Sequence, residues 1–125
     1  NEKLMDTTMQ ALSQAQADVF IAKHSFDEQI KRFILVAQDV INQHFKDMHF
    51  HAKPPTLNMQ RGFKYVKVVR EGPGERSAHC FVEIATGFIL KAASYMSPAK
   101  GVRGSIWDGD CGRAAVTPYG ARYMR

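Results

Sequence analysis

Apolar residues recur at the spacing of a helix over residues 3–22. An α-helix places residues three or four apart on one face, so this pattern predicts a helix. The stripe is narrow and rich in Met and Ala, which suits packing on a neighbouring helix or an arm that orders on a partner. Its members are Leu4, Met5, Met9, Leu12, Ala15 and Val19.

A second and longer helix is predicted from residue 25 to about residue 50. Ser25 and Glu28 stand at the spacing of a capping box, in which each side chain bonds the other residue's backbone amide. Lys53 precedes two prolines, and a residue before proline is pushed out of helical geometry. The apolar stripe between these signals is broad, so we expect this helix to bury one face. The stripe consists of Phe26, Ile30, Phe33, Ile34, Ala37, Ile41 and Phe45, widened by Val40 and Met48.

Three runs of β-type residues follow, over residues 63–70, 76–85 and 88–95. Each run is rich in aromatic, branched or small apolar residues that alternate between two faces. The connections, residues 71–75 and Thr86-Gly87, are short enough to join antiparallel strands. One predicted face carries Phe63, Tyr65, Lys67 and Val69 in the first run, and another carries Ala78, Cys80, Val82 and Ile84 in the second.

The predicted fold class is α+β. Two N-terminal helices come first, the longer one packs on a three- to four-stranded antiparallel meander, and an irregular C-terminal segment ends the chain. Residues 56–59 supply the short additional strand. At 125 residues the chain has the size of one domain. We divide it into an N-terminal helical arm, residues 1–24, and a single α+β domain, residues 25–125.

Charge is divided unevenly between the two halves of the chain. Residues 1–52 hold five Lys and Arg against seven Asp and Glu, a net −2, whereas residues 53–125 hold twelve against five, a net +7. All nine glycines and all five prolines fall after residue 53. The basic, turn-rich half points to an acidic partner, although many basic domains bind nothing anionic.

Candidate phosphate-binding residues lie along the predicted strands and in a loop expected at residues 97–105. Main-chain amides beside glycine approach an anion closely, so this loop suits a phosphate as well as it suits a purely structural connection. Trp107 suits either packing on the sheet edge or stacking on a base. The candidate nucleic-acid-binding residues are Lys64, Lys67, Arg70, Lys91, Tyr95, Lys100, Gly101, Arg103, Gly104 and Trp107.

No catalytic site, metal site or cofactor is predicted. His44 and His49 are five residues apart on a helix and face different ways, whereas zinc needs about three or four ligands in fixed geometry. His79 and Cys80 are adjacent in a strand, where successive side chains point to opposite faces, so no nucleophile–base pair is expected. Cys80 and Cys111 are too few for a disulfide framework and are read as reduced thiols.

No apolar run approaches the roughly 18–20 residues needed to cross a bilayer, and no secretory signal is visible. We therefore expect no membrane partner and a cytoplasmic location. The chain begins with Asn rather than Met, which suggests a fragment or a processed form.

Residues 81–108 read FVEIATGFILKAASYMSPAKGVRGSIWD. This stretch resembles a set of small uncharacterised bacteriophage proteins. The shared features are a hairpin with TG at its turn, followed by LKAAS, then PAK, then RG before an Ile-aromatic pair. The tail Pro118-Tyr119-Gly120, with Tyr123 and Arg125, is similar to their usual ending. The resemblance covers about residues 60–125 and carries no established activity. It implies a nucleic-acid-handling or virion role rather than metabolism, in the host cytoplasm or associated with the virion.

Two functions stay open at this point. The first is a non-enzymatic phage-type nucleic-acid-binding protein with weak sequence preference, whose basic β half contacts the phosphates of single-stranded DNA or RNA. Its affinity should fall steeply with salt, because phosphate contacts release counterions. The second is a virion-structural or protein-interaction module that forms a homo-oligomer through the helices of residues 3–50.

Overall fold

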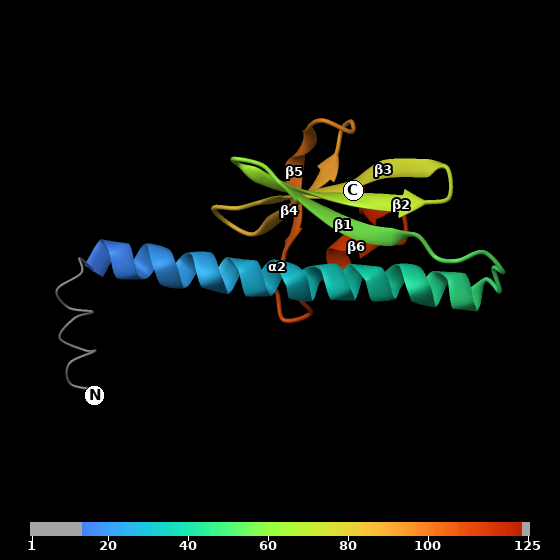
Figure 1. Ribbon diagram of the computed structural model, residues 1–125, viewed down its shortest axis with the longest axis horizontal. Coiled ribbons are helices and arrows are strands. Elements are labelled where there is room, and N and C mark those ends of the chain that lie inside the picture. Colours follow the sequence, from blue (N-terminus) through green and yellow to red (C-terminus); the bar gives the residue numbers. More distant parts are fainter. Residues whose placement is uncertain (1–13, 124–125) are drawn as a thin grey trace.

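A computed structural model of the chain describes residues 14–123, with helix side chains described from Ser25 onward. One long helix, α2 (Gln14–Asp47), lies along one face of a five-stranded antiparallel sheet (Figure 1). Each strand of the sheet pairs with the strand before it in sequence, so the strand order is β1-β2-β3-β4-β5. The strands are β1 (Thr56–Arg61), β2 (Tyr65–Gly72), β3 (Glu75–Glu83), β4 (Phe88–Ala92) and β5 (Pro98–Ser105).

The prediction of two N-terminal helices was wrong, because α2 passes through residues 24 and 25 without a break. Ser25 lies inside the helix and does not cap its start. No glycine or proline occurs before residue 54, so nothing in this part of the backbone interrupts the hydrogen-bonded ladder. The capping pattern at Ser25 is therefore a local preference that helix continuation overrides.

Part of the predicted N-terminal arm lies outside the described residues. Residues 1–13 fall there, and the proposed boundary between residues 24 and 25 falls within α2. The division into an arm and a domain stays a prediction. Within residues 14–123, no helix combines the length and the apolar character that crossing a bilayer requires.

The predicted strand count was also wrong, because the sheet has five strands. A loop was expected at residues 97–105, but Pro98–Ser105 form β5 and pair with β4 from Phe88↔Ser105 to Ala92↔Pro98. Two register shifts interrupt this pairing, and Gly101 takes a φ of +99° that favours glycine. Glycine-rich sequence therefore marks an irregular edge strand here rather than a free loop.

The core lies between α2 and the inner face of the sheet, the face that the helix covers (Figure 1). Phe33 and Ile41 of α2 are fully buried, and burial of such side chains contributes about 1.5–3 kcal/mol each. The strands contribute alternate residues, as expected for a sheet with one covered face. The principal members are Phe26, Ile30, Phe33, Ala37 and Ile41 from the helix and Leu57, Val66, Val68, Cys80, Val82 and Ile89 from the sheet.

A β-bulge changes one predicted face of β3. Val68 pairs with Cys80 but Val69 pairs with Ala78, so His79 is an extra residue in the ladder. Ala78 therefore lies on the opposite face from Cys80 and Val82, although simple alternation predicted one shared face. A bulge of this kind has no signature in the hydrophobic pattern.

The C-terminal segment is more regular than predicted. A short 3₁₀ helix, η1 (Arg113–Ala115), leads into a two-stranded ladder of β6 (Val116–Thr117) and β7 (Gly120–Ala121). Val116 and Ala121 are buried in the core beside α2, so the end of the chain closes one side of it. Short segments of this kind depend on tertiary contacts, which the local sequence does not reveal.

Two glycines allow a matched test of this packing. Gly112 has a φ of +91°, and an added Cβ would lie 2.6 Å from Ile89 Cδ1 and 2.9 Å from Phe33 Cδ1. Gly74 has a φ of +68°, and an added Cβ would meet nothing within 4 Å. We expect Gly74→Ala to cost about 1 kcal/mol through backbone strain alone. We expect Gly112→Ala to cost a further 1–3 kcal/mol or so through overpacking, measured by urea denaturation. Equal losses in the two variants would contradict this account of the core.

Candidate nucleic-acid interface

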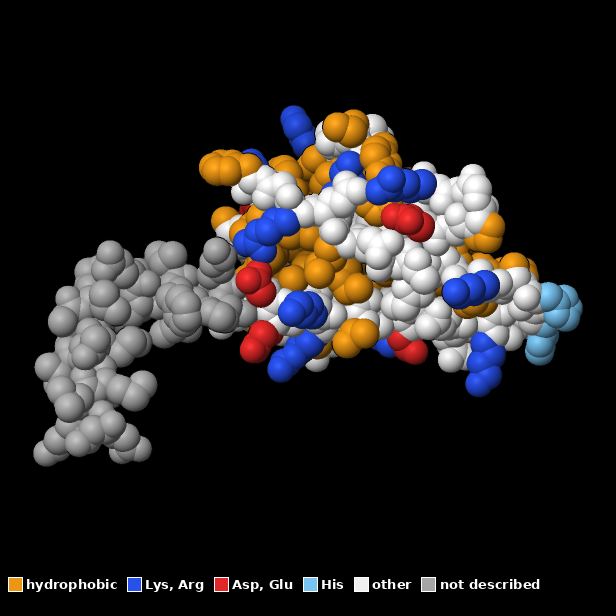
Figure 2. Space-filling model, in the orientation of Figure 1, with side chains coloured by type: hydrophobic (Ala, Val, Ile, Leu, Met, Phe, Trp, Pro, Cys, Tyr) orange, Lys and Arg blue, Asp and Glu red, His pale blue; other side chains and the backbone are white. Residues whose placement is uncertain are grey.

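The face of the sheet away from α2, called the outer face here, carries basic and aromatic side chains. Val66 and Val68 point toward the helix, so Tyr65 and Lys67 between them point to the outer face. Lys67 pairs across the sheet with Phe81 of β3, whose ring centroid lies 6.1 Å from that of Tyr65. Figure 2 shows blue and orange side chains side by side over the sheet, on the side away from the helix.

Two lysines of this face are positioned by aromatic rings. The Nζ atom of Lys67 lies 3.9 Å from the ring centroid of Tyr95, and that of Lys64 lies 5.4 Å from the ring centroid of Tyr65. A cation–π contact orients an ammonium group without cancelling its charge. Neither lysine forms an ion pair among the described residues, so both ammonium groups can still contact an anion.

The β4–β5 loop folds back over the outer face, because its Tyr95 contacts Lys67 of β2. Between this loop and the β1–β2 turn lies a pocket of about 290 Å³, called the outer pocket here. None of the described residues that line it is acidic. They are Gln60, Arg61, Gly62, Phe63, Lys64, Tyr65, Lys67, Phe81 and Met96.

Arginines, not lysines, make the ion pairs in the described part of the chain. Arg61 pairs with Asp27 at 2.8 Å, which holds its guanidinium toward the helix. On the outer face, Glu71 pairs with Arg76 at 3.6 Å. This arrangement leaves the lysines as the unpaired cations among the residues that line the outer pocket.

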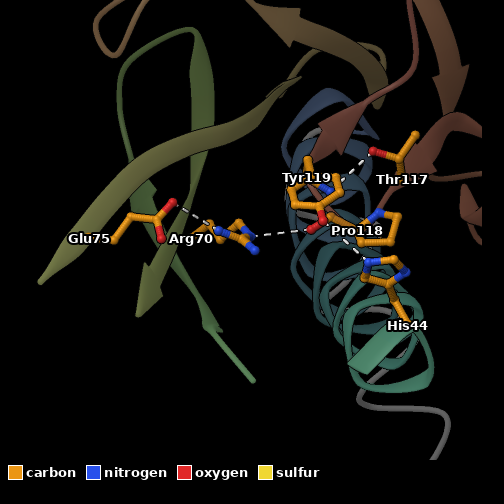
Figure 3. Close-up of polar contacts among 6 residues, drawn as sticks. All are labelled: His44, Arg70, Glu75, Thr117, Pro118 and Tyr119. Atoms are coloured by element: carbon orange, nitrogen blue, oxygen red, sulfur yellow. Dashed lines mark hydrogen bonds and ion pairs between the residues drawn. The ribbon is translucent and has the colours of Figure 1, made fainter. Parts of the chain in front are cut away.

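Arg70, predicted to contact phosphate, lies on the inner face of the sheet and makes contacts within the protein. Only 6% of it is exposed, and its guanidinium donates to the carbonyl of Pro118 at 3.2 Å and to Glu75 at 3.2 Å (Figure 3). It also lies over the ring of Tyr119, whose hydroxyl is 3.3 Å from His44 Nε2. Arg70 therefore joins β2 to the C-terminal segment and is not available to a ligand.

Lys91 and Arg103 also contact the C-terminal segment. Lys91 donates to the carbonyl of Ala121 at 3.4 Å, and its Nζ lies 3.9 Å from the ring centroid of Tyr123. The Arg103 guanidinium donates to the Arg122 carbonyl at 2.8 Å and to the carbonyls of Lys100 and Gly101 at 3.3 Å. These contacts tie β4 and β5 to residues 121–123, and neither Lys91 nor Arg103 lines the outer pocket.

The remaining predicted residues divide between exposed and packed positions. Lys100 is exposed on β5, whereas Gly104 faces η1, where an added Cβ would lie 2.7 Å from the Cβ of Ala115. Trp107 is 49% exposed and its ring covers Gly87, whose added Cβ would lie 2.5 Å from the indole. Of the ten predicted residues, the structure brings together Lys64, Lys67 and Tyr95 at the outer face.

Sequence reasoning did not assign Phe63, Phe81 and Met96 to the site. Phe63 was placed within a strand, but it lies in the turn between β1 and β2. The signal available was an aromatic residue directly after Gly62 and directly before Lys64. Met96 carried no signal, because its position depends on how the β4–β5 loop folds over the sheet.

His79 and Cys80 approach each other, contrary to the prediction that they point to opposite faces. The bulge brings His79 Nδ1 to 3.3 Å from Cys80 Sγ, and both residues are buried. Burial raises the pKa of the Cys80 thiol far above its ordinary value. Burial also lowers the pKa of His79 to about 4, helped by the charges of Arg70 and Lys91 and opposed by the Thr117 backbone. The pair is therefore neutral, whereas a nucleophilic cysteine needs a lowered pKa.

The predicted absence of a metal site stays a prediction for the chain as a whole. Among residues 14–123, no three His, Cys, Asp or Glu side chains lie close enough to hold a metal ion. His44 instead packs edge-on against Phe50, with ring centroids 5.7 Å apart.

The buried His79 predicts how stability depends on pH. Its pKa is about 4 in the folded protein against 6.5 for the ordinary group, so the unfolded chain binds more protons between these values. Stability should therefore rise with pH from 4 to 6.5, by about 3 kcal/mol from this residue alone. Urea denaturation across this range measures the slope.

A variant pair isolates the contribution of His79. His79→Gln should remove most of this slope, whereas His51→Gln, at an exposed loop position, should leave it unchanged. A slope that is the same in His79→Gln and in the unaltered protein would show that another group causes the pH dependence.

Comparison with models of protein families gives a match over residues 4–118 to a "Family of unknown function (DUF7717)". Comparisons with curated proteins and with solved structures give no match. No activity or ligand is transferred by these comparisons.

Proposed function

The chain belongs to this family of unknown function, and from its own surface we propose that it is a non-enzymatic nucleic-acid-binding protein. It contacts the phosphates of single-stranded DNA or RNA through Lys64 and Lys67, with weak sequence preference. The observation that carries the proposal is the outer pocket, where two lysines and several aromatic rings meet without a carboxylate in the lining.

This combination suits a single strand of nucleic acid. A strand presents phosphates at regular intervals and bases whose flat faces stack on aromatic rings. Lysines bind phosphate as point charges, and their contacts need no fixed geometry. Tyr65 and Tyr95 supply rings within the same surface.

A protein partner fits this surface less well. Lysine is depleted at protein–protein interfaces, because its strongly hydrated charge is costly to bury. The outer pocket places two lysines at its rim without an acidic neighbour in the lining. The charge of the β half, +7 over residues 53–125, supports an anionic partner as well.

The resemblance of residues 60–125 to small bacteriophage proteins leads us to propose a viral setting. In that setting the protein acts in the host cytoplasm or with the virion. The resemblance supports the viral origin only. The proposal that the protein binds nucleic acid depends on the residues of the outer face.

Fluorescence anisotropy with a labelled oligonucleotide of about ten nucleotides tests the proposal. Two phosphate contacts on a single strand give a salt slope of about −1.4, so the affinity should fall roughly sevenfold between about 50 mM and about 200 mM salt. The double variant Lys64→Ala with Lys67→Ala should bind more weakly and lose most of this salt dependence.

A matched control removes the same charge from the opposite side of the molecule. Lys31 and Lys46 are exposed on α2, so Lys31→Ala with Lys46→Ala changes the net charge equally but leaves the outer face intact. This control should keep both affinity and slope. Equal weakening by the two double variants would indicate a non-specific charge effect, and the proposal would fail.

A second candidate is a protein-interaction module that oligomerises through its N-terminal helical region. The observation in its favour is that α2 continues well beyond the edge of the sheet (Figure 1). In addition, Leu35 of α2 is 71% exposed and lines a groove with Ile34 and Leu57. Exposed apolar surface of this kind marks interaction sites.

The second candidate predicts an oligomer that is insensitive to salt. Light scattering after size-exclusion chromatography should show this oligomer at both salt concentrations, and removal of residues 1–24 should abolish it. A monomer at all concentrations tested would exclude this candidate.

A further inference from the structure

Phe63 is the most exposed aromatic side chain among residues 25–123, with a relative exposure of 104%. Burial of a phenylalanine is among the larger contributions to stability, and none of it is gained here. The side chain thus contributes no packing to the fold. A single exposed apolar side chain is ordinary on a protein surface, so it is the position of Phe63 in the lining of a pocket that also holds Lys64 and Lys67 that points to a ligand.

The turn that carries Phe63 is fixed in place. The Gly62 amide donates to the Tyr65 carbonyl at 2.8 Å, which closes the turn. The Ile84 amide donates to the Lys64 carbonyl at 3.0 Å, which ties the turn to the end of β3. The backbone on both sides of Phe63 is held by these bonds. The backbone that carries the ring is therefore already ordered, which lowers the backbone entropy lost when the ring meets a ligand.

The outer pocket lies directly beside this ring. Tyr65 and Phe81 lie in it with their rings nearly perpendicular, at an interplanar angle of 79°. Its volume of about 290 Å³ is at the small end of the range of about 300–1,000 Å³ for small-molecule sites. This space suits one planar ring rather than a larger ligand.

We propose that the outer pocket receives one unpaired base of a single-stranded nucleic acid, with Phe63 stacked on that base. Lys64 and Lys67 contact the phosphates on either side of it. The inference rests on the proposed function and adds that recognition includes a base and not phosphates alone. Bases inside a duplex are covered by their neighbours, so the pocket selects single strands over duplexes.

The occupant is identified by charge and by shape together. An anionic ligand is favoured because two lysines and no carboxylate line the pocket. A flat ligand is favoured because Phe63 and Tyr65 offer ring surfaces, whereas Phe81 is buried beside Tyr65 and supports its ring. An unpaired nucleotide has both properties, since it joins a planar base to a charged phosphate.

The test uses the full chain and an oligonucleotide of about ten residues with 2-aminopurine at its centre, prepared in DNA and in RNA form. Binding to the unaltered protein should quench the 2-aminopurine fluorescence, because the base stacks on a ring. Phe63→Ala should lower the affinity about tenfold and remove most of the quenching. Its salt slope should stay unchanged, since the phosphate contacts remain.

Two further variants serve as controls. Phe63→Tyr keeps an aromatic ring and should retain both affinity and quenching. Leu35→Ala removes an exposed apolar side chain of α2 that lines a different groove, and should change neither. Because Phe63 is fully exposed, Phe63→Ala should keep the folded structure, and an unchanged thermal midpoint confirms this.

The outcomes separate this inference from the proposed function. One outcome is that Phe63→Ala binds and quenches normally while the lysine double variant still loses the salt dependence. That result would overturn the proposal that the pocket receives a base, and would leave the proposal of phosphate binding intact. Tighter binding to a duplex than to either single strand would also overturn the base pocket. Absence of any oligonucleotide binding at low salt would overturn both, and binding only to vesicles containing phosphatidylserine would reassign the surface to a membrane.

Discussion

Burial of one stripe of α2 against the inner face of the sheet is the interaction on which the rest of the molecule depends. Phe26, Ile30, Phe33, Ala37 and Ile41 cover this face, and Val66 and Val68 of β2 with Cys80 and Val82 of β3 pack against them. Because side chains of a strand alternate between faces, the choice of Val66 and Val68 for the core sends Tyr65 and Lys67 to the other side. The position of the helix therefore decides which basic residues are available to a ligand.

The outer face is shaped by features that depart from regular geometry. The β4–β5 loop folds back until Tyr95 meets Lys67, and this turns one part of the sheet surface into a pocket. The bulge at His79 bends β3 and buries a neutral histidine–cysteine pair within the core. Arg70, Arg103 and Lys91 connect the C-terminal segment to the sheet through backbone carbonyls, whereas Lys64 and Lys67 line the outer pocket.

The spacing of hydrophobic residues along the chain predicted much of the fold but little of the candidate site. The stripe from Phe26 to Phe45 and the alternation in the β runs indicate an α+β chain with an antiparallel sheet. The false break at Ser25 arose because a capping pattern is a local preference that helix continuation overrides. The strand β5 was missed because its glycines resemble those of a loop. Its pairing with β4 depends on tertiary structure, which the local sequence does not reveal. Arg70 and Arg103 illustrate the same limit for function: charge is visible in sequence, but the carbonyls that engage it come from residues 19 or 48 positions away.

We propose that α2 occupies the inner face of the sheet and leaves the outer face free to bind single-stranded DNA or RNA. The most direct test is an NMR titration with a short single-stranded oligonucleotide, in which the change of each amide chemical shift is measured. We predict that the largest shifts fall in residues 60–67 and 93–97, with the amides of α2 almost unmoved. Shifts concentrated along α2 or in residues 113–123 would contradict it.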